Sequence, residues 1–146
     1  MKKNAFTMVE LIIIMVIIGV ILVFSLPKIT STLEKNKKDA MIVDAKNFVE
    51  MVKTHLSITQ DYPTQGSNKV FTLDGIDTKK EIDKSPYGNS YNRSDSIVTV
   101  VLDRIGSLKS YRFVVVLTDD KYTLNTRNSD YSELNGTEKY EYILRK

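Results

Sequence analysis

Apolar residues divide the chain into a long apolar start and a mixed remainder. Between Phe6 and Leu26 there are 21 residues, and Glu10 is the only charged one among them. As an α-helix this run would be about 31 Å long, which matches the hydrocarbon core of a bilayer. A carboxylate inside such a run is costly unless a neighbouring group neutralises it. The pattern therefore predicts a membrane-spanning helix with one unusual acidic position.

The helical pattern continues past Pro27 but becomes amphipathic. No glycine or proline interrupts residues 28–62, and apolar residues recur there at spacings of three, four and seven. We therefore expect one helix from about Phe6 to Thr59, whose second half buries an apolar stripe under a sheet. The expected stripe consists of Ile29, Leu33, Met41, Ala45, Phe48, Val49, Val52 and Leu56.

The rest of the chain has short β-branched or alternating stretches separated by turn-forming residues. Tyr111–Leu117 places Tyr111, Phe113, Val115 and Leu117 on one face and Arg112, Val114 and Val116 on the other, so it is predicted to be a central, largely buried strand. A long helix packed against a small antiparallel sheet of three or four strands gives an α+β fold. The candidate strands are Lys69–Leu73, Ser96–Asp103, Tyr111–Leu117, Tyr122–Thr126 and Lys139–Arg145, with a hairpin loop at Gly106, a turn at Asp119-Asp120, and loops at Asp74–Arg93 and Asn128–Glu138.

Composition narrows the function classes. The formal net charge is +3, and Lys2 and Lys3 supply two of these charges, so no nucleic-acid partner is predicted. The chain has no Cys and a single His, His55, for which a surface role is expected. No phosphate-binding loop or nucleophile elbow is present in the sequence. We therefore expect no enzyme, with no catalytic residue, cofactor or metal, and interpret the scattered loop acids as solvated rather than as calcium ligands.

The basic start, residues 1–4, and the apolar run leave three interpretations open. A secretory signal peptide would have a shorter apolar run and a small-x-small cleavage site, which is not found before Lys28. A plain membrane anchor fits the length and the positive-inside rule but does not explain Glu10. In the third interpretation the chain is cut before Phe6, and the new α-amine lies one helical turn from Glu10.

The stretch Ala5-Phe6-Thr7-Met8-Val9-Glu10 resembles the class III signal of type IV pilins and pseudopilins. That signal has a short basic leader, a small residue that is usually Gly, then Phe-Thr-Leu-(Ile/Val)-Glu and an apolar helix; here Ala5 replaces the Gly and Met8 the Leu. The resemblance covers residues 2–27 closely and the remainder only in architecture. It implies that prepilin peptidase cuts between Ala5 and Phe6 and methylates the Phe6 amine. It also implies that Glu10 pairs with the Phe6 amine of a neighbouring subunit, whereas a Glu10 that reaches water at the membrane interface is the alternative.

Gly19 and Pro27 are the weak points of the predicted helix, because Gly has low helix propensity and Pro removes an amide donor. Both match family positions between which the helix unwinds in the assembled filament. The alternative for Pro27 is a helix breaker that ends a membrane anchor.

These observations predict a structural subunit of a type IV pilus-like filament that serves adhesion, motility or a related surface function. The expected segments are a leader (1–5), a transmembrane and polymerisation helix (6–27), an amphipathic helix half (28–59) and an extracytoplasmic sheet domain (60–146). The expected partners are other copies and related pilin subunits, prepilin peptidase, the pilus assembly platform and the cytoplasmic membrane before assembly. The membrane form would be single-pass with its N-terminus inside, and the filament would be extracellular.

Two alternatives stay open at this point. One is a pseudopilin or minor pilin of a type II secretion or DNA-uptake system. The other is a membrane-anchored extracellular binding domain that never polymerises.

Overall fold

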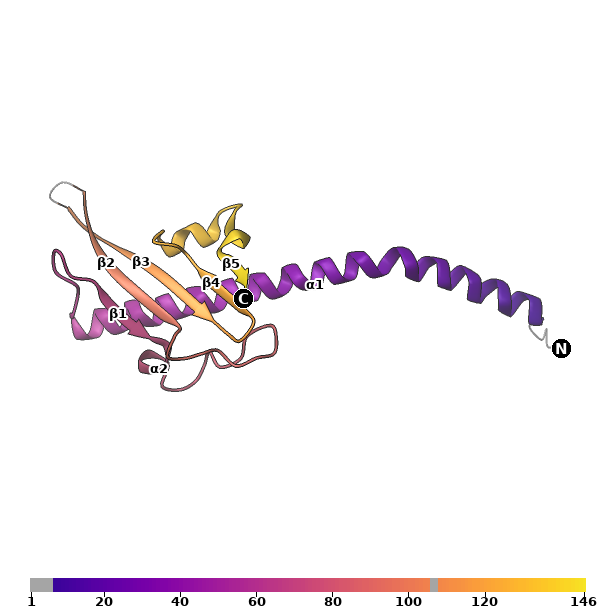
Figure 1. Ribbon diagram of the computed structural model, residues 1–146, viewed down its shortest axis with the longest axis horizontal. Coiled ribbons are helices and arrows are strands. Elements are labelled where there is room, and N and C mark those ends of the chain that lie inside the picture. The colour runs from indigo at the N-terminus through magenta and orange to yellow at the C-terminus, as the bar shows by residue number, and fades with distance from the viewer. Residues whose placement is uncertain (1–6, 106–107) are drawn as a thin grey trace, which may run out of the picture. The chain divides into compact units, whose positions relative to one another are not determined.

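A long helix and a five-stranded antiparallel sheet make up the fold. The computed structural model describes residues 7–105 and 108–146. The helix α1 (Met8–Thr59) has 52 residues. The chain divides between Asn36 and Lys37 into two compact units, and the sheet lies along the part of α1 that belongs to the second unit (Figure 1).

Helix α1 continues through both of its predicted weak points. It includes Gly19 and Pro27 and ends at Thr59, as expected from the uninterrupted pattern. The alternative in which Pro27 ends the helix is therefore wrong. At the C-terminal end Gln60 adopts a left-handed backbone conformation (φ 55°) and its N–H still donates to the Leu56 carbonyl, which closes the last turn.

The sheet is an antiparallel meander in which each strand pairs with the next along the chain. The β2–β3 hairpin is its longest part, with Val100 opposite Phe113 and Asp103 opposite Ser110. Both outer strands are short. The elements after α1 are β1 (Lys69–Thr72), α2 (Leu73–Ile76), β2 (Ile97–Ile105), β3 (Leu108–Thr118), β4 (Tyr122–Asn125), the 3-10 helices η1 (Tyr131–Asn135) and η2 (Lys139–Tyr142), and β5 (Ile143–Arg145).

The core forms between α1 and the inner face of the sheet. Six members of the predicted stripe are fully buried, as is the inner face of the central strand at Val115 and Leu117. Ile29 and Leu33 are exposed, so their assignment to the buried stripe was wrong. They precede Asn36 and belong to the unit that carries no strand. The buried members of the stripe are Met41, Ala45, Phe48, Val49, Val52 and Leu56.

The predicted number of strands, three or four, was too low, because both short outer segments pair with the sheet. The segment Lys139–Arg145 was also only partly a strand, since its first four residues form η2 and only Ile143–Arg145 pairs with β4. Tertiary contacts favour this conformation: the Tyr140 hydroxyl and the Lys139 ammonium both donate to Asp39 of α1, at 2.8 and 2.7 Å.

Two predicted loops contain short helices. In addition, a side chain stabilises the predicted turn that lacks glycine. Helix α2 lies at the start of the loop after β1, and η1 lies in the loop after β4. In the turn between β3 and β4, Asp119 is buried and its Oδ1 accepts from the backbone N–H groups of Lys121 and Tyr122, both at 2.7 Å. This Asx-type arrangement explains how the turn forms without Gly. Gly106 lies outside the described residues.

Candidate assembly site at the N-terminal helix

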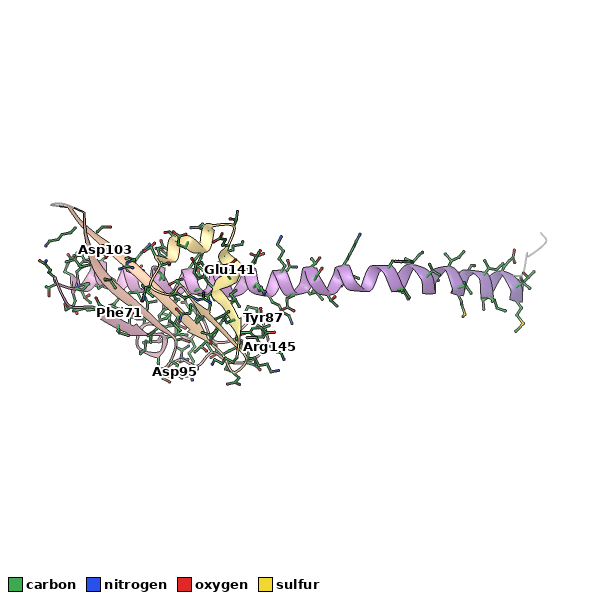
Figure 2. All side chains as sticks on the ribbon, turned by 45° about the horizontal axis from the view of Figure 1, so that its top comes forward. Phe71, Tyr87, Asp95, Asp103, Glu141 and Arg145 are labelled. Carbon is green, nitrogen blue, oxygen red and sulfur yellow. The ribbon has the colours of Figure 1, made fainter. Side chains whose placement is uncertain are left out.

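The N-terminal part of α1 is an exposed apolar surface. Every side chain from Met8 to Phe24 is exposed, and these side chains radiate from the helix (Figure 2). Phe24 keeps 73% of its surface accessible. Soluble monomers rarely expose an apolar surface of this extent, so lipid or a partner protein must cover it. Within the described residues, α1 is the one helix that is long and apolar enough to cross a membrane.

A reciprocal hydrogen-bond pattern organises the beginning of this helix. Glu10 Oε2 accepts from the backbone N–H of Thr7 at 2.8 Å and from its hydroxyl at 2.9 Å. In return, the backbone N–H of Glu10 donates to Thr7 Oγ1 at 3.3 Å. This is a capping box, in which an N-cap Thr and a Glu three positions later satisfy free donors of the first helical turn.

The capping box holds the Glu10 carboxylate at the start of the helix. Its negative charge is favoured there because the helix N-terminus carries a partial positive charge. The box uses only Oε2, and Oε1 makes no hydrogen bond with any other residue that the structure describes.

Sequence reasoning predicted Glu10 as a functional residue but missed Thr7. The signal was available, because Thr-x-x-Glu before an apolar run is the pattern of a capping box. Ala5 and Phe6, the predicted cleavage and methylation positions, lie outside the described residues, and the intermolecular Glu10–Phe6 pair stays a prediction.

Gly19 has open space around it, since a Cβ added there would meet no heavy atom within 4 Å. Packing within the subunit therefore does not require glycine at this position.

An open groove lies between α1 and the segment after α2 in the second unit. It has a volume of about 600 Å³ and is lined by Asp44, Asn47, Glu50, Met51, Thr54, His55, Ile58 and residues 76–79, 81 and 82. His55 packs edge-on against Phe71, with ring centroids 5.7 Å apart. In the part of the chain that the structure describes, no three His, Asp or Glu side chains come together as a metal site.

The acidic residues of this unit have structural partners. Asp44 is half-buried, and burial raises the pKa of its carboxyl, an effect opposed by a 2.8 Å hydrogen bond from the Tyr91 hydroxyl. Burial alone would raise the pKa of Asp77 as well. The backbone N–H groups of Ile82 and Glu81 and the Arg93 guanidinium outweigh it and lower the pKa of Asp77 below its ordinary value. The Tyr91 contact attaches the segment after α2 to α1, and the contacts of Asp77 hold that segment together internally.

Comparison with known proteins supports the N-terminal assignment. The α+β arrangement, a long N-terminal helix packed with a small antiparallel sheet, is consistent with a pilin-like fold. Residues 1–26 match the prokaryotic N-terminal methylation motif, which is the class III signal of type IV pilins and pseudopilins. Neither the search of curated proteins nor the search of solved structures found a match.

Proposed function

We propose that this chain is a structural subunit of a type IV pilus-like filament, cut by prepilin peptidase before Phe6 and assembled through its N-terminal helix. The observation that carries the proposal is the methylation motif at residues 1–26, which leads directly into an exposed apolar helix with a single carboxylate. The processing motif and the exposed apolar surface thus lie on the same N-terminal segment.

The exposed apolar surface explains both stages of the proposed pathway. Before assembly, lipid covers residues 8–24, and Lys2 and Lys3 keep the N-terminus on the cytoplasmic side. After assembly, the helices of neighbouring copies replace the lipid. The sheet unit remains outside the membrane throughout and ends on the filament surface.

Glu10 makes the exchange of lipid for protein directional. A carboxylate in the apolar region is costly when unpaired, and a neighbouring copy that offers the methylated Phe6 amine removes this cost. The capping box supports the pairing, because it fixes the Glu10 carboxylate at the start of the helix through Oε2. Addition of a new copy is therefore stabilised only where its amine and a Glu10 meet.

Mass spectrometry of membranes and sheared surface material tests the proposal. We expect the mature chain to lack residues 1–5 and to begin with a methylated Phe6. A chain that starts at Met1, or after Pro27, would contradict processing of this kind. Abundance of the processed chain in sheared filaments would identify a major subunit, whereas a processed chain confined to membranes would indicate a minor pilin or pseudopilin.

A further inference from the structure

Asn135 is the last residue of the 3-10 helix η1, and it is the one asparagine of the sequence that precedes a glycine. Asn135 and Gly136 are both exposed. The Asn135 side chain contacts α1, because the Lys46 ammonium donates to its Oδ1 at 2.6 Å. This side-chain amide is thus accessible to water while a cation is bonded to its oxygen.

An asparagine followed by glycine has a reactive side chain. The next backbone nitrogen can attack the side-chain amide carbon, Cγ, and close a cyclic imide. The side chain of the following residue hinders this attack, and glycine has none. In the attack at Asn135, negative charge develops on Oδ1, which already accepts from Lys46. A donor placed where charge develops lowers the barrier to a reaction.

We propose that Asn135 is a site of spontaneous deamidation, in which Lys46 assists closure of the imide and then pairs with the carboxylate that forms. The Gly136 nitrogen loses its proton to water and bonds to Asn135 Cγ. The bond between Cγ and Nδ2 breaks, and the amide nitrogen takes up a proton and leaves as ammonia. Water then opens the imide, so the net change replaces an amide NH2 by OH, with no oxidant or reductant.

The two directions of imide opening have different structural results. Opening at Cγ gives an aspartate at position 135 with an ordinary backbone, and its carboxylate lies where the amide now contacts Lys46. A neutral contact between η1 and α1 then becomes an ion pair. Opening at the backbone carbonyl carbon gives an isoaspartate, which adds a carbon to the main chain at the end of η1.

One backbone contact opposes the reaction. The Gly136 N–H donates to the Glu133 carbonyl at 2.9 Å, so the last turn of η1 must open before the nitrogen attacks. Both residues are exposed, and the ends of helices open locally at low cost.

Asn128 is a matched comparison within the same chain. It is also exposed, and the N–H of the next residue, Ser129, donates to the Thr126 carbonyl at 2.8 Å. Backbone protection is therefore alike at the two asparagines. What distinguishes Asn135 is the following glycine and the contact with Lys46.

Peptide mapping of the full chain in detergent tests the site. Trypsin cleaves after Arg127 and Lys139, so one peptide, residues 128–139, contains both Asn135 and Asn128. After incubation at neutral pH, mass spectrometry should locate the deamidated residue at position 135, formed several-fold faster than at position 128. Absence of conversion at Asn135, or equal rates at the two asparagines, would overturn the proposal.

Two substitutions separate the glycine from the lysine. Gly136→Ala adds a methyl group, placed 3.2 Å from the Glu133 carbonyl oxygen, and should remove most of the conversion at Asn135. Lys46→Met keeps the apolar stem without the ammonium and should slow the conversion several-fold, with the rate at Asn128 unchanged. If Lys46 only held η1 against α1, its loss would free the turn and speed the conversion. An unchanged or faster rate in Lys46→Met would therefore overturn the assistance by Lys46.

A double-mutant cycle tests the contact made by the product. Lys46→Met should lower the denaturant midpoint more in a chain that carries Asn135→Asp than in the natural chain, because only the aspartate forms an ion pair with Lys46. Lys79→Met, in an exposed lysine after α2, is the control and should have the same effect in both chains. Equal effects of Lys46→Met in the two chains would contradict the product pair.

Discussion

Thr7 and Glu10 cap the start of α1 by hydrogen bonds in both directions: the carboxylate accepts from the Thr7 backbone and hydroxyl, and the Glu10 N–H donates to the hydroxyl. The proposed assembly pair therefore begins from a carboxylate that the subunit already orients. This arrangement separates two roles of Glu10, the cap and the charge, which substitutions can distinguish.

Thr7→Val should weaken the cap and reduce assembly. It removes the hydroxyl at nearly constant size, and loss of an N-cap side chain costs about 1 kcal/mol. With one donor to Oε2 lost, the carboxylate is less well oriented towards an incoming amine. We expect fewer filaments by electron microscopy, with processing before Phe6 retained by mass spectrometry. Thr7→Ser keeps the hydroxyl and should assemble normally, so an equal defect in Ser and Val would contradict the role of the cap.

Glu10→Gln should be processed normally but fail to assemble. The amide oxygen can still accept from Thr7, so the cap survives, whereas the negative charge that would pair with the Phe6 amine is lost. Filament counts and N-terminal mass measure the two effects separately. Glu10→Ala removes both the cap and the charge, so its loss of filaments should be at least as large as that of Glu10→Gln. Normal filament numbers in Glu10→Gln would show that the cap, and not the charge, is what assembly needs.

Gly19→Ala should make the apolar helix harder to unwind. Open space around Gly19 means that the added methyl group causes no clash within the subunit, while Ala is favoured over Gly in a helix by about 1 kcal/mol. If the segment between Gly19 and Pro27 unwinds in the filament, amide hydrogen exchange there should be slower in the Ala variant. The exchange rate of Gly19→Ser should lie between those of the natural chain and Gly19→Ala. Equal exchange in all three filaments would contradict unwinding at this segment.

The parts of the fold that follow a strong hydrophobic period could be predicted. The stripe from Met41 to Leu56 follows a helical period and is buried as expected, and the runs around Val98 and Val115 form the central strands. These elements bury enough apolar surface for the local pattern to decide their conformation.

Short polar segments could not be predicted in the same way, because distant partners determine them. The first part of Lys139–Arg145 alternates like a strand, but contacts to Asp39, about a hundred residues earlier, favour a 3-10 helix. Ile29 and Leu33 continue the apolar period of α1 without a surface to cover them in one subunit. At the candidate site, the pattern Thr-x-x-Glu was enough to predict the cap. The proposed pair between Glu10 and the Phe6 amine joins two copies, so the structure of a single chain cannot contain it.

Asp77→Asn should destabilise the sheet unit and alter its response to acid. The Asp77 side chain is 1% exposed and accepts from the Arg93 guanidinium and two backbone N–H groups, so removal of its charge leaves a largely buried Arg93 without its closest counter-ion. Breaking a buried pair of this kind costs about 3 kcal/mol. The full chain in detergent should therefore unfold at lower denaturant concentration at pH 7, as followed by circular dichroism.

The sign of the pH dependence follows from the lowered pKa of Asp77. A carboxyl whose folded pKa lies below the unfolded value of about 3.9 contributes stability above that value and loses it as the pH falls through the folded pKa. The natural chain should therefore lose more stability than Asp77→Asn between neutral pH and pH of about 3, so that the two unfolding curves converge in acid. Glu81→Gln, in an exposed neighbour, is the control and should change stability at pH 7 by less than about 0.5 kcal/mol. Parallel curves with a constant gap at all pH values would show that the Asp77 charge does not stabilise the fold.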